Sequence, residues 1–226
     1  MDLTGIHLFK GLGPAELKPL EAISTPRKFE KGDTLFVEGE SPDNLWFILD
    51  GEVKIFKEYS SGKSAIMGIY GEGEAVAIVA VIDGKAYPAS CQAIIGGNAV
   101  VMKRSDALKV VTTNPKLALE VMMDLCGRLR TMTTHLGSMS VQSVIRRLSR
   151  FLLRLADEMG VKKGGGTHVN LFLTRKELAE CIGTSFEVVV RCLGKLKDEG
   201  ILEIEGKKLV IYDREKLDKI AEAEGD

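Results

Sequence analysis

The sequence predicts an α+β chain in which a β-barrel or sandwich is followed by a long helix and a winged helix-turn-helix. Three observations support this prediction. Short β-rich runs broken by glycine fill residues 27–103, and an apolar helical repeat fills residues 115–136. Two short helical patterns joined by a tight turn fill residues 173–200, and a hairpin pattern follows them. We therefore expect three parts, with bounds of 1–113, 114–137 and 138–226.

The N-terminal part begins with a short helical pattern around Pro14, whose apolar face holds Leu17, Leu20 and Ile23. Residues 27–103 then show strand-like runs at regular spacing, which is typical of a compact barrel or sandwich. Glycines mark the expected turns, where a positive φ or close packing excludes a side chain: Gly32, Gly39, Gly51 and Gly73. A short helix follows, and Ser105 is its expected N-cap.

The long helical stretch starts at Pro115 and repeats apolar residues at three- and four-residue steps. Two interpretations fit this stripe. The helix is either an ordinary core helix packed on the barrel, or it pairs with the same helix of a second chain in a dimer interface, called the seam below. The stripe consists of Leu119, Met122, Met123, Cys126, Leu129 and Met132. The helical pattern weakens at residues 137–140, where we expect a hinge.

An amphipathic helix is expected over residues 141–160, with a buried face made of Val144, Leu148, Phe151, Leu152 and Leu155. We expect its three arginines to be mostly solvated, with a minor role in phosphate binding: Arg146, Arg147 and Arg150. The glycine-rich residues 162–166 read as a loop. The chain closes with a helix from about Arg214.

Residues 173–200 carry the signals of two helices and the turn between them. Thr174 is the expected N-cap of the first helix, and Glu177 completes a capping box. Gly183 and Thr184 make the turn, and Ser185 is the expected N-cap of the second helix. The second helix has a core face at helical spacing and ends near a glycine: Val189, Leu193, Leu196 and Gly200.

The other face of this second helix carries residues that cannot join the core face. Its first turns, the part of a recognition helix that meets base edges in the major groove, hold the base-reading candidates Ser185, Phe186, Glu187, Val190 and Arg191. A carboxylate can accept from the cytosine amino group, and an arginine can donate twice to guanine. Glu187 and Arg191 are also spaced for an ordinary i,i+4 ion pair, worth about 0.2–0.5 kcal/mol. Charge alone does not separate these two interpretations.

A hairpin pattern follows at residues 201–213, with Gly206, Lys207 and Lys208 at its turn. A helix-turn-helix followed at once by a basic-tipped hairpin is a winged helix-turn-helix. The phosphate-contact candidates are Thr174, Arg175, Lys195, Lys207 and Lys208. Residues 137–212 hold 13 Lys and Arg against 9 Asp and Glu, whereas the rest of the chain holds 18 against 23. The basic excess therefore lies in the proposed DNA-binding part.

This C-terminal unit resembles the DNA-binding domain of the CAP/FNR (Crp/Fnr) family of bacterial transcription regulators. Ser185, Glu187 and Arg191 match the family's Ser/Thr-Arg-Glu-x-x-x-Arg recognition helix, and Phe186 departs from it. The segments KGDTLFVEGE and ILDGEVKIF resemble the family's cyclic-nucleotide-binding domain, so the resemblance covers nearly the whole chain. It implies a jelly-roll sensor, a homodimer paired through the long helix, a palindromic double-stranded DNA operator and contact with RNA polymerase.

The expected sensor pocket differs from that of the cAMP-binding relatives. In those relatives a Gly-Glu pair engages the ribose and an Arg-Ser pair holds the cyclic phosphate. Here the matching positions are occupied by Ala77 and Ile78, and by Tyr87 and Pro88. Met132 and Thr133 replace the Thr-Ser pair that contacts adenine. Because the phosphate loses its bidentate charged partner, we expect this sensor not to bind cAMP or cGMP.

The positions of the histidines and cysteines limit which other cofactors and which classes of function the sequence allows. Residues 1–90 contain no cysteine, which excludes the N-terminal iron–sulfur cluster that some relatives carry. Other relatives hold haem, and the candidate haem ligands here are His7 and His135, so a haem-based gas or redox sensor is the alternative function. A jelly-roll enzyme would need histidines on its strands. Residues 27–103 contain none, so we expect a protein that is not an enzyme.

The composition is that of an ordinary globular chain, with 45% hydrophobic and 28% charged residues. No apolar run approaches the ~20 residues of a membrane span. The first residues lack the basic and apolar regions of a secretory signal, so we expect a cytoplasmic location and no membrane partner. The four cysteines form no C-x-x-C pair, so we expect neither a zinc site nor a disulfide framework.

Overall fold

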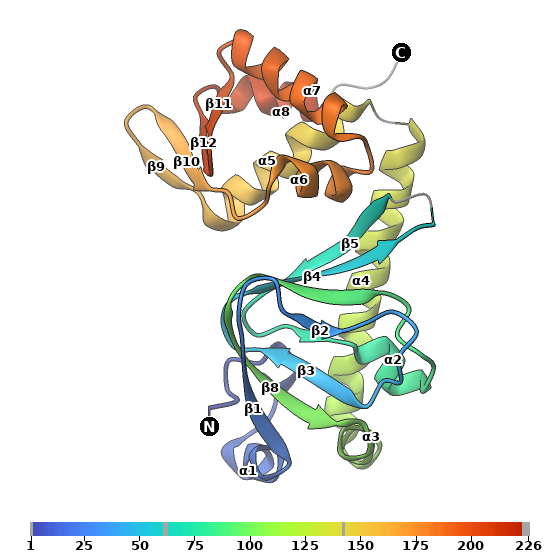
Figure 1. Ribbon diagram of the computed structural model, residues 1–226. Coiled ribbons are helices and arrows are strands. Elements are labelled where there is room, and N and C mark those ends of the chain that lie inside the picture. The colour runs from blue at the N-terminus through green and yellow to red at the C-terminus, as the bar shows by residue number, and fades with distance from the viewer. Residues whose placement is uncertain (1, 61–62, 142, 223–226) are drawn as a thin grey trace. The chain divides into compact units, whose positions relative to one another are not determined.

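The computed structural model describes residues 2–60, 63–141 and 143–222, which form two compact units. The first unit is Met1–Thr131 and the second is Met132–Asp226. In Figure 1 the strands of the first unit run from blue to green, and the helices of the second unit run from yellow to red. Each unit has its own sheets and its own buried side chains.

The strands of the first unit form two antiparallel sheets, with the orders β1-β8-β3-β6 and β2-β7-β4-β5. The strands are β1 (Ser24–Phe29), β2 (Thr34–Phe36), β3 (Asn44–Ile48), β4 (Glu52–Glu58), β5 (Ser64–Tyr70), β6 (Ala75–Val76), β7 (Ser90–Ile95) and β8 (Gly97–Lys103). Two facing four-stranded sheets make a jelly roll. The fold predicted for residues 27–103 is therefore confirmed.

Helices lie before, within and after the barrel: η1 (His7–Phe9), α1 (Pro14–Ala22), α2 (Ile78–Asp83), α3 (Arg104–Thr113) and α4 (Pro115–Val141). The helix predicted around Pro14 is confirmed, with Leu17 and Leu20 buried. The N-cap predicted at Ser105 is wrong, because α3 begins at Arg104 and Lys103 takes the cap position without a side-chain hydrogen bond. Helix α4 continues through residues 137–140, where the weakened sequence pattern led us to expect a hinge.

Two clusters of buried side chains fill the barrel unit. One cluster joins the N-terminal helices, one sheet and the start of α4, and includes Phe9, Phe47, Ile78, Leu117 and Val121. The other lies between the sheets and includes Phe29, Phe36, Ile48, Val53, Tyr87 and Cys91. Two expected sensor-pocket residues, Ile78 and Tyr87, thus belong to different cores of the unit.

Tyr87 is a structural member of its core. Its side chain is only 4% exposed and stacks on Phe36, with ring centroids 4.2 Å apart and planes inclined by 23°. The hydroxyl donates to the carbonyl oxygen of Asn44 at 3.3 Å, and burial raises the pKa of the phenol. The aromatic ring therefore occupies hydrophobic interior at a position where a sensor pocket was expected from the sequence.

The second unit consists of α5 (Val144–Met159), β9 (Val161–Lys163), β10 (Gly166–Asn170), α6 (Arg175–Ile182), α7 (Phe186–Asp198), β11 (Leu202–Glu205), β12 (Lys208–Ile211) and α8 (Arg214–Glu222). Its antiparallel sheet has the order β11-β12-β10-β9 and lies beside the helices (Figure 1). The predicted winged helix-turn-helix is confirmed, with α6 and α7 as its two helices and β11 and β12 as the wing.

The loop predicted at residues 162–166 is wrong, because these residues form a hairpin between β9 and β10. Gly164 and Gly165 make its two-residue turn with φ of 58° and 83°. A two-residue turn with positive φ at both positions is the type I′ geometry that joins antiparallel strands, and glycine adopts it without strain. The glycine pair was therefore a hairpin signal rather than a loop signal.

Two arginines of α5 hold the ends of other helices, although the sequence suggested solvated side chains. Arg147 Nε donates to the carbonyl oxygen of Ile182 at 2.9 Å, at the end of α6. Arg150 donates from one terminal nitrogen to the carbonyl oxygen of Ala221 at 2.9 Å, in the last turn of α8. A cation at a helix C-terminus satisfies unpaired carbonyl groups and is favoured by the helix dipole.

The first prediction concerns Tyr87. Tyr87→Arg should lower the free energy of unfolding of the barrel unit by about 3–5 kcal/mol, because the packing of a large side chain is lost and a charge enters the core. Tyr87→Phe removes one long hydrogen bond and should cost less than about 1 kcal/mol. Urea unfolding followed by fluorescence of Trp46, the single tryptophan, measures both values in this unit.

A matched control is Tyr59→Arg, since Tyr59 is an aromatic residue of the same unit with 49% of its side chain exposed. This control should unfold at the wild-type urea concentration. Wild-type stability of Tyr87→Arg would show instead that residue 87 faces a polar pocket.

Candidate nucleic-acid interface and sensor pocket

The helix-turn-helix is held by caps that the sequence predicts. Thr174 Oγ1 accepts from the Glu177 N–H at 3.2 Å, and Glu177 Oε2 accepts from the Thr174 N–H at 2.9 Å, which completes the capping box. Gly183 ends α6 with φ of 68°, the left-handed conformation that favours glycine. Ser185 takes the N-cap position of α7, but its side chain makes no capping hydrogen bond.

The face of α7 divides as expected. Val189, Leu193 and Leu196 are buried in the core of the unit. The base-reading candidates are all exposed: Ser185, Phe186, Glu187, Val190 and Arg191. They come together on the first two turns of one helix, which is the arrangement that major-groove reading requires.

Glu187 and Arg191 are not paired with each other. Among the residues that the structure describes, no ion pair joins these two side chains. Instead, hydrogen bonds from the Ser185 hydroxyl and from its own backbone N–H hold the pKa of the Glu187 carboxyl below its ordinary value. The i,i+4 ion pair that competed with DNA reading is therefore not formed, and Glu187 is an ionised acceptor at neutral pH.

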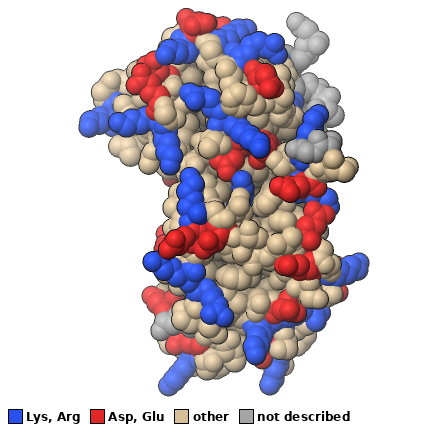
Figure 2. All heavy atoms as spheres, in the orientation of Figure 1, with Lys and Arg blue, Asp and Glu red and all other residues tan. Residues whose placement is uncertain are grey.

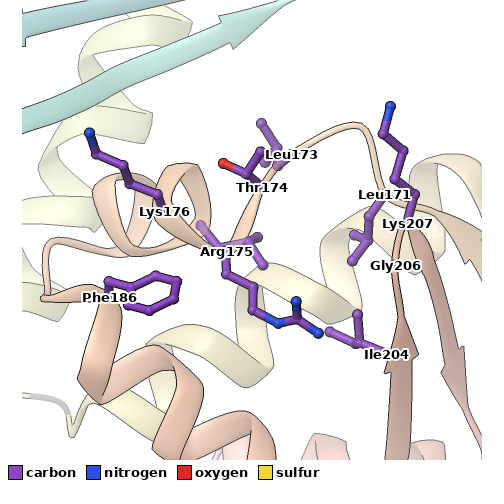
Figure 3. Close-up of a pocket in the computed structure, with 10 residues that line it drawn as sticks. Leu171, Leu173, Thr174, Arg175, Lys176, Phe186, Ile204, Gly206 and Lys207 are labelled. Atoms are coloured by element: carbon purple, nitrogen blue, oxygen red, sulfur yellow. The ribbon is translucent and has the colours of Figure 1, made fainter.

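Three of the phosphate-contact candidates, Thr174, Arg175 and Lys207, line a groove between α6, α7 and the wing. This groove has a volume of about 320 Å³ and an apolar floor, and Arg175, Lys176 and Lys207 are its charged lining residues. The Lys207 carbonyl accepts from the Leu171 N–H at 2.6 Å and so ties the wing tip to the approach of α6. In Figure 3 Arg175 extends across the groove toward the wing, while Lys176 and Lys207 point outward.

The remaining phosphate-contact candidates differ in whether their polar groups already contact other residues of the unit. Lys208 is exposed at the first position of β12, opposite Glu205 and Asn170 in the sheet. Lys195 lies 4.0 Å from Glu199 on the same helix. The N–H and hydroxyl of Thr174 both donate to Glu177, so this residue contributes mainly to the helix start. Basic side chains lie across the face of the second unit shown in Figure 2, with acidic side chains between them.

The sensor-pocket residues lie at two places in the barrel unit and on α4. Ala77 precedes α2 with φ of 74° and is the only non-glycine with positive φ in the described chain. Ile78 is buried, as described above, whereas Pro88 is exposed and its carbonyl accepts from Lys57 Nζ at 3.3 Å. Met132 and Thr133 are exposed on α4. None of these six residues supplies a cation for a phosphate.

A partly buried cation that was not predicted from the sequence, Arg128, lies beside this region. Arg128 Nε donates to Asp124 Oδ2 at 2.6 Å, and a terminal nitrogen donates to the carbonyl oxygen of Ala75 at 2.6 Å. The guanidinium also lies 4.7 Å from the centre of the Tyr70 ring, whose pKa is raised by burial. The i,i+4 spacing of Asp124 and Arg128 could have predicted their ion pair from the sequence. The hydrogen bond from Arg128 to Ala75 of β6 could not be predicted in this way, because the two residues are far apart in the sequence.

Of the two candidate haem ligands, only the side chain of His7 is described. His7 is exposed on η1, and a Cβ placed on Gly73 would lie 2.7 Å from both Cδ2 and Nε2 of its ring. The ring edge that would bind iron therefore faces backbone and not a haem-sized apolar enclosure, so His7 does not fit this role. The side chain of His135 lies outside the described residues. Groups of three or more potential metal ligands are absent from the described part of the chain.

The proposed seam residues are exposed on α4 in the single chain. Leu119 and Met122 are each 55% exposed, and Leu129 is 65% exposed. Met123, Cys126 and Met132 are exposed as well. On the opposite side of the helix, Leu117 and Val121 are buried in the barrel core. The helix therefore fits both sequence interpretations, with one face in the core and one apolar face uncovered.

Comparisons with known proteins agree with this architecture. Residues 26–114 match the cyclic nucleotide-binding domain model, and residues 146–220 match the Crp-like helix-turn-helix domain model. The chain is 30% identical over 210 residues to the CRP-like cAMP-activated global transcriptional regulator of Mycobacterium tuberculosis, covering 93% of this chain and 94% of the relative. It is 29% identical to the anaerobic regulatory protein of Bacillus subtilis, covering 88% and 84%.

Solved structures share the fold. FixK2 from Bradyrhizobium japonicum superposes with a TM-score of 0.77 at 22% identity and covers 89% of this chain and 98% of its own. The global regulator CLP of Xanthomonas campestris gives a TM-score of 0.79 at 22% identity, covering 88% of this chain and 99% of its own.

No described helix is long and apolar enough to cross a bilayer. The two domain matches and the full-length similarity show that this non-enzymatic chain is a DNA-binding transcription regulator of the Crp/Fnr family.

Proposed function

We propose that this regulator acts as a homodimer on a palindromic operator and does not use cAMP as its effector. The observation that carries the DNA part is the exposed, unpaired Glu187 and Arg191 on the first turns of α7. Such a regulator works with RNA polymerase in the cytoplasm, and we extend the proposal to that partner and location. Selection of operators from a random DNA library is the direct test.

Arg191 is assigned to a guanine and Glu187 to a cytosine of a neighbouring base pair. The guanidinium can donate to two acceptors of guanine, and the carboxylate can accept from the cytosine amino group. Arg175, Lys207 and Lys208 stand around the groove and the wing, so we assign them to phosphates. Phosphate contacts set the register of the protein on DNA and are insensitive to sequence.

The dimer is proposed through the uncovered face of α4. Leu119, Met122, Cys126 and Leu129 follow one another at spacings of three, four and three residues, which is the a and d pattern of a coiled coil. In a parallel two-stranded coil, equal positions of the two helices meet at the seam. Two-fold pairing also presents two recognition helices, so the half-sites should be centred about one or two turns of DNA apart.

The absence of cAMP sensing rests on the missing cation and on packing. Tyr87 fills core space, and Ile78 offers no hydrogen bond to a ribose. Lys85, two residues before Tyr87 in sequence, points into solvent with 85% of its side chain exposed and lies 3.9 Å from Asp83. Lys57, which donates to the Pro88 carbonyl, is paired with Glu38 at 2.7 Å. Arg128 is engaged by Asp124 and Ala75. The mycobacterial relative is named as cAMP-activated, so this part of the proposal predicts a difference between two similar proteins.

The second prediction separates base reading from phosphate binding. Arg191→Ala should weaken binding to the selected operator by about 1–3 kcal/mol and relax the preference at one guanine. Lys208→Ala should weaken binding to all sequences alike and reduce the slope of log affinity against log salt by about one per lost contact. Fluorescence anisotropy over a salt series measures both effects. A uniform loss in Arg191→Ala would reassign this residue to the backbone.

The third prediction concerns the seam. Met122→Glu places a carboxylate in the proposed apolar interface of both protomers, so sedimentation should show a monomer and operator affinity should fall. Met67→Glu is the control, because Met67 is also exposed and lies on β5 of the barrel. Copper-phenanthroline oxidation should cross-link the wild type through the exposed Cys126 and should fail in Cys126→Ser. A dimeric Met122→Glu variant would place the interface elsewhere.

The fourth prediction is that cAMP and cGMP leave the protein unchanged. Unmade hydrogen bonds in a closed pocket cost about 1–3 kcal/mol each, and the ribose and phosphate would lack several. Isothermal titration with millimolar nucleotide should give no saturable heat, and operator affinity should stay the same. Micromolar binding that disappears in Lys85→Ala would contradict the proposal and make Lys85 the phosphate ligand.

A further inference from the structure

We propose that the recognition helix reads thymine through its 5-methyl group, using an apolar stripe made of Phe186 and Val190. The stripe lies next to the charged stripe of Glu187 and Arg191 on the same helix. This inference rests on the proposed base-reading role of α7 and adds what α7 selects beside a G·C pair. It also assigns a function to Phe186, the residue that departs from the family's recognition pattern.

The stripe is separate from the core face of the helix. Phe186 and Val190 are one turn apart, with 47% and 41% of their side chains exposed. The core contacts of α7 come from Val189, Leu193 and Leu196, which are buried. Two apolar side chains at i and i+4 on an otherwise polar helix surface therefore remain uncovered by the unit that carries them.

The stripe is continuous with the groups assigned to base edges. Glu187 and Arg191 each follow a stripe residue in sequence, so the two stripes run side by side along the first two turns of α7. A partner that covers one stripe must also approach the other. The major groove offers hydrogen-bonding edges and one apolar feature, the thymine methyl group, which apolar side chains contact. That combination matches the two stripes.

Phe186, the first residue of the stripe, lies at the edge of an apolar groove. Phe186 is the first residue of α7 and lines the groove whose floor includes Leu173 and Leu178. Figure 3 shows its ring at the start of α7, close to the end of the groove formed by Arg175 and Lys176. The phosphate candidates Arg175 and Lys207 line the same groove as Phe186, so the apolar stripe begins beside the proposed backbone contacts.

The third position along the stripe is Gly194, one turn after Val190. A Cβ added there would contact nothing within 4 Å in the chain, so no internal packing requires glycine. No polar side chain therefore interrupts this side of α7 before its last turn. The expected half-site has at least one thymine next to the G·C pair that Glu187 and Arg191 read.

Replacement of thymine by deoxyuridine tests the inference, because uracil lacks only the methyl group. Burial of one methyl-sized group corresponds to about a fourfold change in affinity, and symmetric replacement in both half-sites to about fifteenfold. Operators are first selected from random DNA with the full-length protein. Each thymine of the selected operator is then replaced by deoxyuridine in both half-sites, and affinity is measured by anisotropy.

The variants Phe186→Ala and Val190→Ala locate the methyl contact. At the sensitive thymine, the wild type should lose about fifteenfold on replacement, and at least one variant should bind thymine and uracil operators equally. Tyr212→Ala and Val161→Ala are matched controls, because both residues are exposed apolar side chains of the same unit outside α7. Both controls should keep the wild-type preference for thymine. Circular dichroism checks that each variant is folded.

Two results would overturn this inference and leave the DNA-binding proposal intact. One is a selected operator at which no deoxyuridine replacement changes wild-type affinity. The other is full thymine preference in the Phe186→Ala, Val190→Ala double variant. Failure to select any sequence would overturn the base-reading proposal itself, and the inference with it.

Discussion

The hydrogen bond from Arg147 Nε to the carbonyl oxygen of Ile182 links α5 to the end of the helix that precedes the recognition helix. It binds α5 to the end of α6, immediately before the left-handed turn at Gly183. Arg150, one turn further along α5, holds the end of α8 in the same way. Helix α5 thus holds the C-terminal ends of two other helices. The buried face of α7 and the left-handed Gly183 fix α7 relative to the end of α6 that Arg147 holds.

The DNA-binding unit and the sensor unit use their polar groups differently. In the DNA-binding unit, the base-reading candidates on the outer face of α7 are exposed, which leaves them accessible to bases. In the sensor unit, Arg128 is bonded to Asp124 and Ala75 and contacts the ring of Tyr70. A partly buried cation with these partners has few hydrogen-bonding groups left for a ligand. Exposed polar groups available to a partner are therefore found mainly on the DNA-binding unit.

Local sequence signals predicted the parts of the fold that local physics decides. The capping box of Thr174 and Glu177, the left-handed Gly183 and the core face of α7 each depend on residues within one or two turns. Contacts between distant residues were not readable. Arg147 and Ile182 are separated by 35 residues and Arg150 and Ala221 by 71, so no spacing rule connects them. For this reason the side chains of Arg147 and Arg150 were expected to be solvated.

The errors of the sequence analysis also have physical reasons. A pair of glycines after two lysines reads as a loop by composition, whereas positive φ at Gly164 and Gly165 makes it a hairpin turn. Helix α4 continues past Gly137 because a single glycine weakens a helix without ending it. In the sensor, the identities of Ile78 and Tyr87 predicted a pocket without polar partners. Only the structure places them in two different hydrophobic cores.

The burial of Tyr87 bears on how this regulator can evolve. Tyr87, at a position that the resemblance assigns to phosphate binding, packs in a hydrophobic core of the barrel. A mutation to arginine at this position is expected to weaken the fold before further changes could provide a ligand contact. New ligand specificity is therefore more accessible from side chains that do not pack in the core.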